Sequence, residues 1–206
     1  DFLPKSIEGA LKVIPEANLA LISVAGRYAA DEAMKALQQG LHVMIFSDNV
    51  PLEKEVELKK YAKDKGLLVM GPDCGTAIIN GVPLGFANVV NRGDIGIVAA
   101  SGTGLQEVTC IIGNQGAGIS QAIGTGGRDV WQEVGGIMFL EGLKALKDDE
   151  KTKVIVLVSK PPHEDVLQKI AEELQNVLKP VVAMFIGADP EIIEDTGAIP
   201  AGTLEE

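Results

Sequence analysis

The chain has 206 residues and a formal net charge of −11, which argues against nucleic acids and anionic membrane surfaces as partners. Hydrophobic residues make up 46% of the sequence but aromatic residues only 4%. A core of Ile, Val, Leu and Ala is therefore expected, as in α/β proteins with buried parallel strands.

Strand-like and helical stretches alternate through the first part of the chain. Two helical patterns end at Gly40 and Gly66, residues typical of the position just after a helix. Pro51 opens the second helix, a position at which an N–H group would have no acceptor within the helix. This alternation is typical of a doubly wound parallel sheet. The expected strands cover residues 19–24, 41–46 and 67–70, and the expected helices cover residues 29–39 and 51–65.

The segment 73–92 interrupts this rhythm with glycine, asparagine and Pro83, and we interpret it as a connection between two units. A second series of strands and crossover helices follows, in a flavodoxin-like layout. Its expected strands are 95–99, 119–123, 154–158 and 180–186, and its expected helices are 103–114, 134–146 and 162–177. The fold class is α/β, with domains predicted over residues 1–80 and 93–206 and a connection over 81–92.

The turn after residues 95–99 is the strongest functional signal. Ser101, Gly102 and Thr103 follow an apolar strand and open a helix. A helix N-terminus carries about half a positive charge and unpaired N–H groups, so it favours a phosphate, a carboxylate or an acyl phosphate. The alternative is a plain strand-to-helix turn in which glycine only permits tight packing.

Ligands of open α/β sheets bind beyond the carboxyl ends of the strands. Two further loops of the second series end there, and we expect them to meet the turn at Ser101. One contains Gly126, Gly127 and Arg128, and the other contains Lys160. Hydroxyls, backbone N–H groups and two cations would together hold an oxyanion.

Each of these residues also has a simpler interpretation. Ser101 fits a helix N-cap, Arg128 fits a surface ion pair with Asp129, and Lys160 fits a solvated loop. His163, at a helix start in the same loop as Lys160, could present its ring to the crevice.

Other titratable residues give weaker signals. His42 lies in an apolar strand and is expected to be a structural histidine. No metal-ligand spacing is present. Cys74 and Cys110 form neither a disulfide framework nor a CxxC pair, which fits a reducing cytoplasm. No membrane span or signal peptide is visible, and the start at Asp1 suggests a piece of a longer polypeptide.

Several motifs, in this order, resemble the succinyl-CoA synthetase α subunit and, more closely, the FdrA family of acyl-CoA-synthetase-like proteins. They lie at residues 47–50, 66–76, 93–103, 126–129, 158–162 and 196–202, and the resemblance extends from Asn18 onward. It implies a partial CoA-binding Rossmann-like domain over 1–80 and a flavodoxin-like ligase domain over 93–206. It also implies that the Ser101 turn holds an active-site phosphate. The positions that the resemblance places along a CoA site are Ser47, Asp48, Asn49, Pro72, Asp73 and Cys74.

Three positions depart from the family pattern. Asp195 stands where the synthetases carry the phosphohistidine, and Lys160 aligns with the glutamate that steadies this histidine. Asp73 replaces an asparagine and adds negative charge along the expected CoA path. A phosphohistidine relay is therefore not expected, whereas a phosphate or an acyl phosphate would suit the added cation.

The resemblance implies acyl-phosphate chemistry in purine or allantoin breakdown, in which oxalurate and phosphate give oxamate and carbamoyl phosphate. The catalytic candidates are Lys160, Arg128 and His163. The alternatives are an NDP-forming acyl-CoA synthetase, with His163 as phosphate acceptor, and a non-catalytic subunit that binds CoA or a nucleotide. CoA is a candidate cofactor, no metal is expected, and the partners would be a small anionic metabolite and companion subunits of a homo- or hetero-oligomer.

Overall fold

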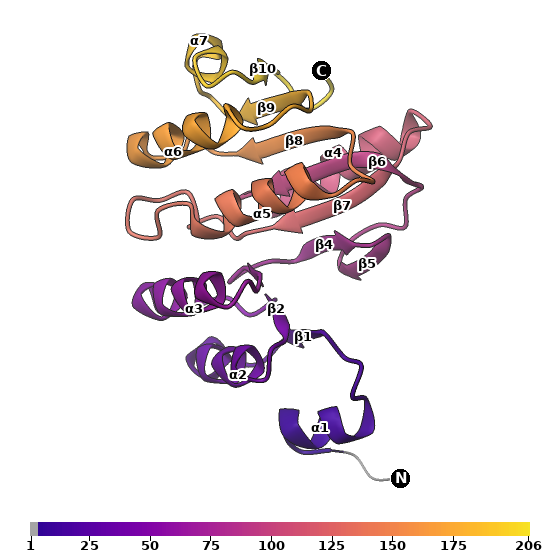
Figure 1. The fold of residues 1–206 in the computed structure, drawn as a ribbon, viewed down its shortest axis with the longest axis vertical. Helices are drawn as coiled ribbons and strands as arrows, with labels where there is room; N and C mark the ends of the chain where they lie inside the picture. The colour runs from indigo at the N-terminus through magenta and orange to yellow at the C-terminus, as the bar shows by residue number, and fades with distance from the viewer. Residues whose placement is uncertain (1–3) are drawn as a thin grey trace.

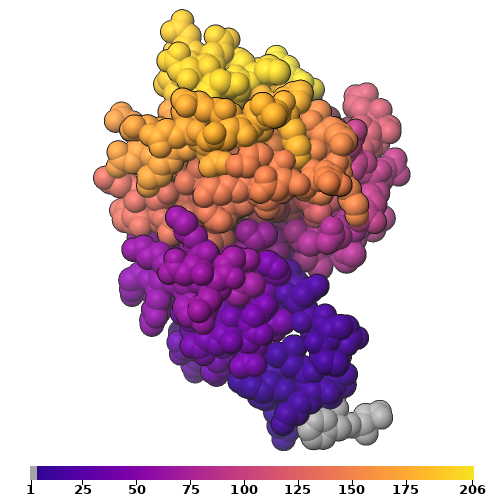
Figure 2. Space-filling view, viewed as in Figure 1, coloured from indigo at the N-terminus to yellow at the C-terminus, as the bar shows by residue number. Residues whose placement is uncertain are grey.

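The computed structural model describes residues 4–206 and contains two sheets, each with its own helices. The smaller sheet and its helices lie at the N-terminal end of the long axis, and the larger sheet fills the other end (Figure 1). In the space-filling view the two units adjoin without a visible gap between them (Figure 2). Every helix within residues 4–206 is too short or too polar to span a lipid bilayer.

The smaller sheet has three parallel strands in the order β1-β2-β3. Helix α2 packs on it through a stripe of small residues (Ala29, Ala33 and Ala36) that is fully buried at helical spacing. The elements are α1 (Ile7–Val13), β1 (Leu19–Ile22), α2 (Gly26–Gln38), β2 (His42–Ile45), α3 (Leu52–Asp64) and β3 (Val69–Met70).

The larger sheet has seven strands in the order β10-β9-β8-β6-β7-β4-β5. The strands from β10 to β7 are parallel, whereas β4 runs antiparallel to both β7 and β5. The strands are β4 (Thr76–Ile79), β5 (Val82–Gly85), β6 (Arg92–Ala99), β7 (Ile119–Gly124), β8 (Val154–Ser159), β9 (Val181–Phe185) and β10 (Ile199–Pro200).

The helices of this unit cover both faces of the sheet. Figure 1 shows α5 and α6 in front of the sheet and α4 behind it. Their buried side chains are almost all aliphatic, as the composition predicts. The helices are α4 (Gly102–Asn114), α5 (Ile137–Asp148), α6 (Glu164–Leu174) and α7 (Pro190–Glu194).

The two units share their cores. Met44 and Met70 of the smaller sheet belong to the main cluster around β6 and β8, and Met138 of α5 belongs to the cluster beneath α2 and α3. The N–H group of Val69 lies 3.2 Å from the Met138 sulfur. Side chains of each unit therefore lie in the core of the other. Because protein cores are close-packed, this arrangement limits movement of one unit relative to the other.

The predicted α/β class and the alternation of strands and helices are confirmed, but segment 73–92 differs from the expected irregular connection. It contains the hairpin β4–β5, which joins the larger sheet. Asn80 and Gly81 form its two-residue turn with φ of 52° and 79°, as a type I′ turn requires. Pro83 is tolerated because β5 is an edge strand.

The helix expected from residue 134 begins at Ile137 instead. Gly135 and Gly136 adopt φ of 75° and 70°, which is left-handed backbone that an α-helix cannot contain. The helix after β8 also ends earlier than expected, at Leu174.

Candidate functional site: a loop cluster at the carboxyl ends of the strands

The loops after β6, β7 and β8 lie side by side. The N–H group of Ala100 donates to the carbonyl of Val158 (2.9 Å), and the N–H group of Thr125 donates to the carbonyl of Ala99 (2.8 Å). Gly127 lies beside the same backbone, since a Cβ built on it would be 3.8 Å from the Ala100 carbonyl oxygen. The strand order thus brings the N-terminus of α4 next to the loop 124–129, here called the glycine loop.

This edge of the sheet presents unpaired backbone donors. Ser101 is the N-cap of α4, and its Oγ accepts a hydrogen bond from the Gly104 N–H group (3.2 Å). Within residues 4–206, the N–H groups of Gly102, Thr103 and Gly127 donate to no protein acceptor, and all three residues are exposed. An anion placed here would meet several N–H groups and the positive end of the helix dipole.

Arg128 does not point to this cluster of donors. Its Nη2 donates to the Val50 carbonyl (2.8 Å) and lies 2.8 Å from Glu55 Oε2 on α3. This second contact is an ion pair without the alignment of a hydrogen bond. The alternative of a surface pair between Arg128 and Asp129 is wrong, because the buried Glu55 carboxylate takes the guanidinium.

Asp129 is fully buried and pairs with Lys59 instead. Lys59 Nζ donates to Asp129 Oδ1 (2.8 Å), Glu55 Oε1 (2.7 Å) and the Thr125 carbonyl (2.9 Å). The Asp129 carboxylate also accepts the Met138 and Phe139 N–H groups at the start of α5. Glu55 and Lys59 did not emerge from the sequence, where a pair four residues apart on a helix usually indicates a solvated face.

Lys160 follows β8 and is exposed, with no ion pair among residues 4–206. His163 is the N-cap of α6. Its ring Nδ1 accepts a hydrogen bond from the Asp165 backbone N–H group (3.3 Å), and its backbone N–H group donates to the Val130 carbonyl (3.0 Å). Its ring is therefore engaged in helix capping, and Nε2 is its remaining nitrogen. Lys160 is the cation of the predicted set that stays available to an anion.

The residues predicted along a CoA site gather at the carboxyl edge of the smaller sheet. Ser47 Oγ accepts from the Val24 N–H group (3.0 Å), and the Ser47 carbonyl accepts from Asp73 (3.0 Å). Ser47, Pro72 and Cys74 are buried, whereas Asp48, Asn49 and Asp73 are exposed. The buried members tie the loops together, and the exposed ones add two carboxylates to the surface.

Burial raises the pKa of the Cys74 thiol to about 11. Its Sγ lies 3.4 Å from the Thr76 carbonyl, and Gly124 leaves room for it. A thiol in this state is protonated at neutral pH and packs as a small apolar side chain.

Two other predicted positions are His42 and Asp195. His42 Nδ1 accepts from the Leu68 N–H group (2.9 Å), and burial lowers the pKa of its imidazole, as expected of a structural histidine. Asp195 is exposed at the C-cap of α7.

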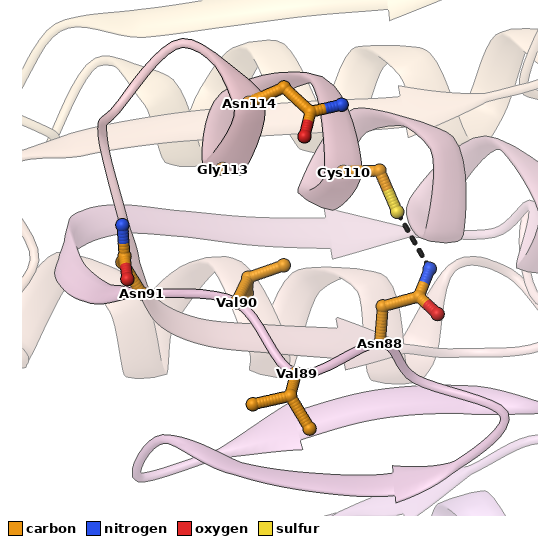
Figure 3. Close-up of a pocket in the computed structure, with 7 residues that line it drawn as sticks. All are labelled: Asn88, Val89, Val90, Asn91, Cys110, Gly113 and Asn114. Atoms are coloured by element: carbon orange, nitrogen blue, oxygen red, sulfur yellow. Dashed lines mark hydrogen bonds between the residues drawn. The ribbon is translucent and has the colours of Figure 1, made fainter.

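Two cavities lie near the amino ends of strands rather than at the loop cluster. The first, of about 330 Å³, lies between residues 88–91 and the end of α4. Figure 3 shows the Asn88 amide directed to Cys110 Sγ, 2.7 Å away. The second, of about 410 Å³, is lined mainly by apolar side chains around His42 and β5.

Comparison with known proteins adds the family context to this geometry. Residues 90–187 match the profile of the CoA binding domain. The chain is 31% identical over 176 residues to the α subunit 2 of ADP-forming succinate–CoA ligase from Archaeoglobus fulgidus, covering 84% of this chain and 60% of that protein. The chain is similar to succinate–CoA ligase α subunits. It is also 52% identical to the uncharacterized protein YahF of Escherichia coli, covering 93% of this chain and 37% of YahF.

Solved structures share the fold. ATP citrate lyase from Methanothrix soehngenii, in complex with citrate and coenzyme A, superposes with a TM-score of 0.76 at 19% identity, over 96% of this chain and 38% of that chain. A dinucleotide-forming acetyl-CoA synthetase from Ca. Korarchaeum cryptofilum, in complex with phosphate and ADP, gives 0.67 at 18% identity, over 91% and 42%.

The matched residues 90–187 run from β6 to β9, in the unit for which the resemblance implies a ligase role, whereas the CoA-binding domain was predicted over residues 1–80. The division into domains and the membership in the FdrA family remain predictions. The chain spans 37% of the length of YahF and 60% of the length of the Archaeoglobus fulgidus subunit.

Proposed function

We propose that this chain is the phosphate-handling part of an acyl-CoA-synthetase-like enzyme. The observation that carries the proposal is a set of exposed N–H groups, those of Gly102, Thr103 and Gly127, near the positive end of α4, which donate to no acceptor within residues 4–206. Lys160 supplies the positive charge from the neighbouring loop. Similarity to a succinate–CoA ligase α subunit and to the fold of an acetyl-CoA synthetase supports the same class of chemistry.

The reaction that suits this site is transfer of a carbamoyl group to phosphate. A phosphate oxygen attacks the ureido carbonyl carbon of oxalurate. The bond from this carbon to the inner nitrogen breaks, and that nitrogen takes a proton as oxamate departs. Carbamoyl phosphate is the other product. Fixed N–H donors and Lys160 would stabilise the charge that develops on the phosphate and on the tetrahedral carbon.

This chemistry needs no phosphohistidine. By the resemblance, Asp195 stands where the synthetases carry that histidine, and we propose Ser101, Gly102 and Thr103 as the phosphate-binding turn. CoA is a candidate ligand of the carboxyl edge of the smaller sheet, at Ser47 and Pro72, and companion subunits are proposed as partners because the matched relatives are named as subunits.

The second candidate is an NDP-forming acyl-CoA synthetase, favoured by the acetyl-CoA synthetase fold. It would require His163 Nε2 as phosphate acceptor. Acid-labile phosphate labelling that is lost in His163→Ala would support this candidate, and carbamoyl phosphate formation that persists in His163→Ala would support the first. Both assays use the complete natural polypeptide with its partners. The third candidate is a binding subunit without activity, which predicts ligand binding but no turnover in the complete polypeptide with its partners.

Phosphate binding to the chain itself is the direct test. Inorganic phosphate is titrated into the wild-type chain and into Lys160→Glu by calorimetry. We expect the variant to bind about tenfold more weakly, equivalent to about 1.4 kcal/mol, because a carboxylate replaces the available cation.

Lys151→Glu is the matched control. Lys151 is exposed in the turn before β8, at the opposite end of the strand from Lys160, and its substitution makes the same change in net charge. Equal affinities of the two variants, or no binding by the wild-type chain, would contradict the proposal.

A further inference from the structure

A buried ion network joins the smaller unit to the glycine loop. It consists of Glu55 and Lys59 from α3 and of Arg128 and Asp129 from the loop (the Lys59 network). The exposed fraction of the side chain is 0% for Lys59, 1% for Glu55 and 0% for Asp129. Groups of this kind are almost never fully buried unless they are paired, so the network marks a place where the fold requires specific geometry.

Each N–H donor of Lys59 has one acceptor. An ammonium group has three donors, and Nζ has three partners, namely Glu55 Oε1, Asp129 Oδ1 and the Thr125 carbonyl, at 2.7 to 2.9 Å. The third partner is a backbone atom of the glycine loop. Lys59 therefore holds the path of the loop main chain as well as the charge of Asp129.

The network anchors the glycine loop at both of its ends. Lys59 fixes Thr125 before the two glycines, and Asp129 after them is bonded to both Lys59 and the first N–H groups of α5. Arg128 adds a second link to the smaller unit through Val50. Between Thr125 and Arg128 lie Gly126 and Gly127, and Gly127 carries one of the donors of the proposed anion site.

We propose that Lys59 is a positioning residue that shapes the glycine loop for anion binding. The smaller unit then contributes to the phosphate site of the larger unit without touching the ligand. The expected effect on phosphate affinity rests on the proposed function. The effect of Lys59 on the glycine loop itself can be measured without any ligand.

The test compares the wild-type chain with the triple variant Glu55→Gln/Lys59→Met/Asp129→Asn. Removing Lys59 alone would leave the buried Asp129 carboxylate without a cation and Glu55 with Arg128 as its remaining one. The triple variant removes the three fully buried charges together, keeps similar side-chain volumes and leaves Arg128 unchanged. Lys147→Met is the control, because Lys147 pairs with Glu173 (2.7 Å) in the last turn of α5, at the opposite end of this helix from the Asp129 contact.

The first readout is amide hydrogen exchange in the ligand-free protein, followed by NMR. The N–H groups of Thr125 and Asp129 are hydrogen-bonded to Ala99 and Gly126. We expect their exchange to be at least tenfold faster in the triple variant, with β8 amides unchanged and with Lys147→Met like the wild type. Unchanged protection of Thr125 and Asp129 in the folded triple variant would overturn the inference.

The second readout is phosphate affinity, which we expect to fall about tenfold in the triple variant. Loss of loop protection with unchanged affinity for phosphate would overturn the claim that the loop is shaped for binding. If the wild-type chain binds no phosphate, the proposed function fails, while the exchange data still decide whether Lys59 positions the loop.

Asp129→Asn serves if the triple variant does not fold. It keeps the shape of the side chain and an acceptor oxygen, and it weakens the contact with Lys59. Faster exchange of Thr125 in this variant supports the inference, and exchange at the wild-type rate overturns it.

Discussion

Arg128 and Lys160 differ in whether their positive charges are already paired within the protein. The Arg128 guanidinium is held by the buried carboxylate of Glu55 and by the Val50 carbonyl, whereas Lys160 is exposed and has no ion pair within residues 4–206. A cation beside a buried carboxylate is strongly attracted because the surrounding dielectric is low. Lys160 therefore carries the electrostatic part of the proposed site.

The burial of His42 predicts how the stability of the chain depends on pH. Burial lowers the pKa of its imidazole in the folded chain, and its Nδ1 accepts from the Leu68 N–H group. The unfolded chain, with a pKa of about 6.5, binds the proton more readily below that pH. The contribution of His42 to stability is thus present above pH of about 6.5 and is lost as the pH falls through and below that value.

Urea unfolding at several pH values measures this effect. His42→Asn keeps a short acceptor for the Leu68 N–H group but cannot titrate, so its free energy of unfolding should fall less on acidification than that of the wild type. Parallel pH profiles for the two proteins would contradict the prediction.

The glycine loop is the element that connects fold and site. Gly126 has φ of 85°, and a Cβ on it would lie 2.6 Å from the Pro72 carbonyl oxygen. Gly127 next to it has open space, with the nearest atom at 3.8 Å. Two adjacent glycines therefore serve different purposes: the first permits the approach of the smaller unit, and the second leaves the donor edge uncovered.

We expect Gly126→Ala to lower the free energy of unfolding by about 1–3 kcal/mol, because the new methyl group meets both a left-handed backbone and a carbonyl oxygen. Gly127→Ala makes the same chemical change one residue later and should stay within about 0.5 kcal/mol of the wild type. Chemical denaturation of both variants measures the difference, and equal losses would show that the strain at Gly126 is absent in solution.

At the scale of the whole molecule, the two sheets form one packed body. Met138 of α5 lies in the core of the smaller unit, Met44 and Met70 lie in the core of the larger one, and the Lys59 network crosses the same interface. Separating the units would expose apolar side chains and leave buried charges without partners. Neither unit is expected to unfold first.

We therefore predict a single cooperative unfolding transition. Trp131, the one tryptophan of the chain, lies in the larger unit after the glycine loop, and far-UV circular dichroism reports on both units. The two signals should change at the same urea concentration. A loss of helical signal that precedes the change in Trp131 fluorescence would show that the smaller unit unfolds separately.

The local pattern of the sequence was sufficient for the α/β class, for the chain order of most strands and helices, and for the strand ends at which Ser101, Gly126 and Lys160 stand. Apolar periodicity and glycine punctuation carry this information because they act between neighbours in the chain. The Asn80–Gly81 turn also contained a hairpin signal, which the irregular composition of segment 73–92 obscured.

Only the tertiary structure decided the partners of the charged side chains. Glu55 and Lys59 have the spacing of an ordinary solvated helix pair, yet they are buried because Asp129, 70 residues further along the chain than Lys59, closes over them. The buried Glu55 carboxylate also holds the Arg128 guanidinium beside α3. The pairing of distant charges depends on which surfaces pack together, and this packing has no local signature in the sequence.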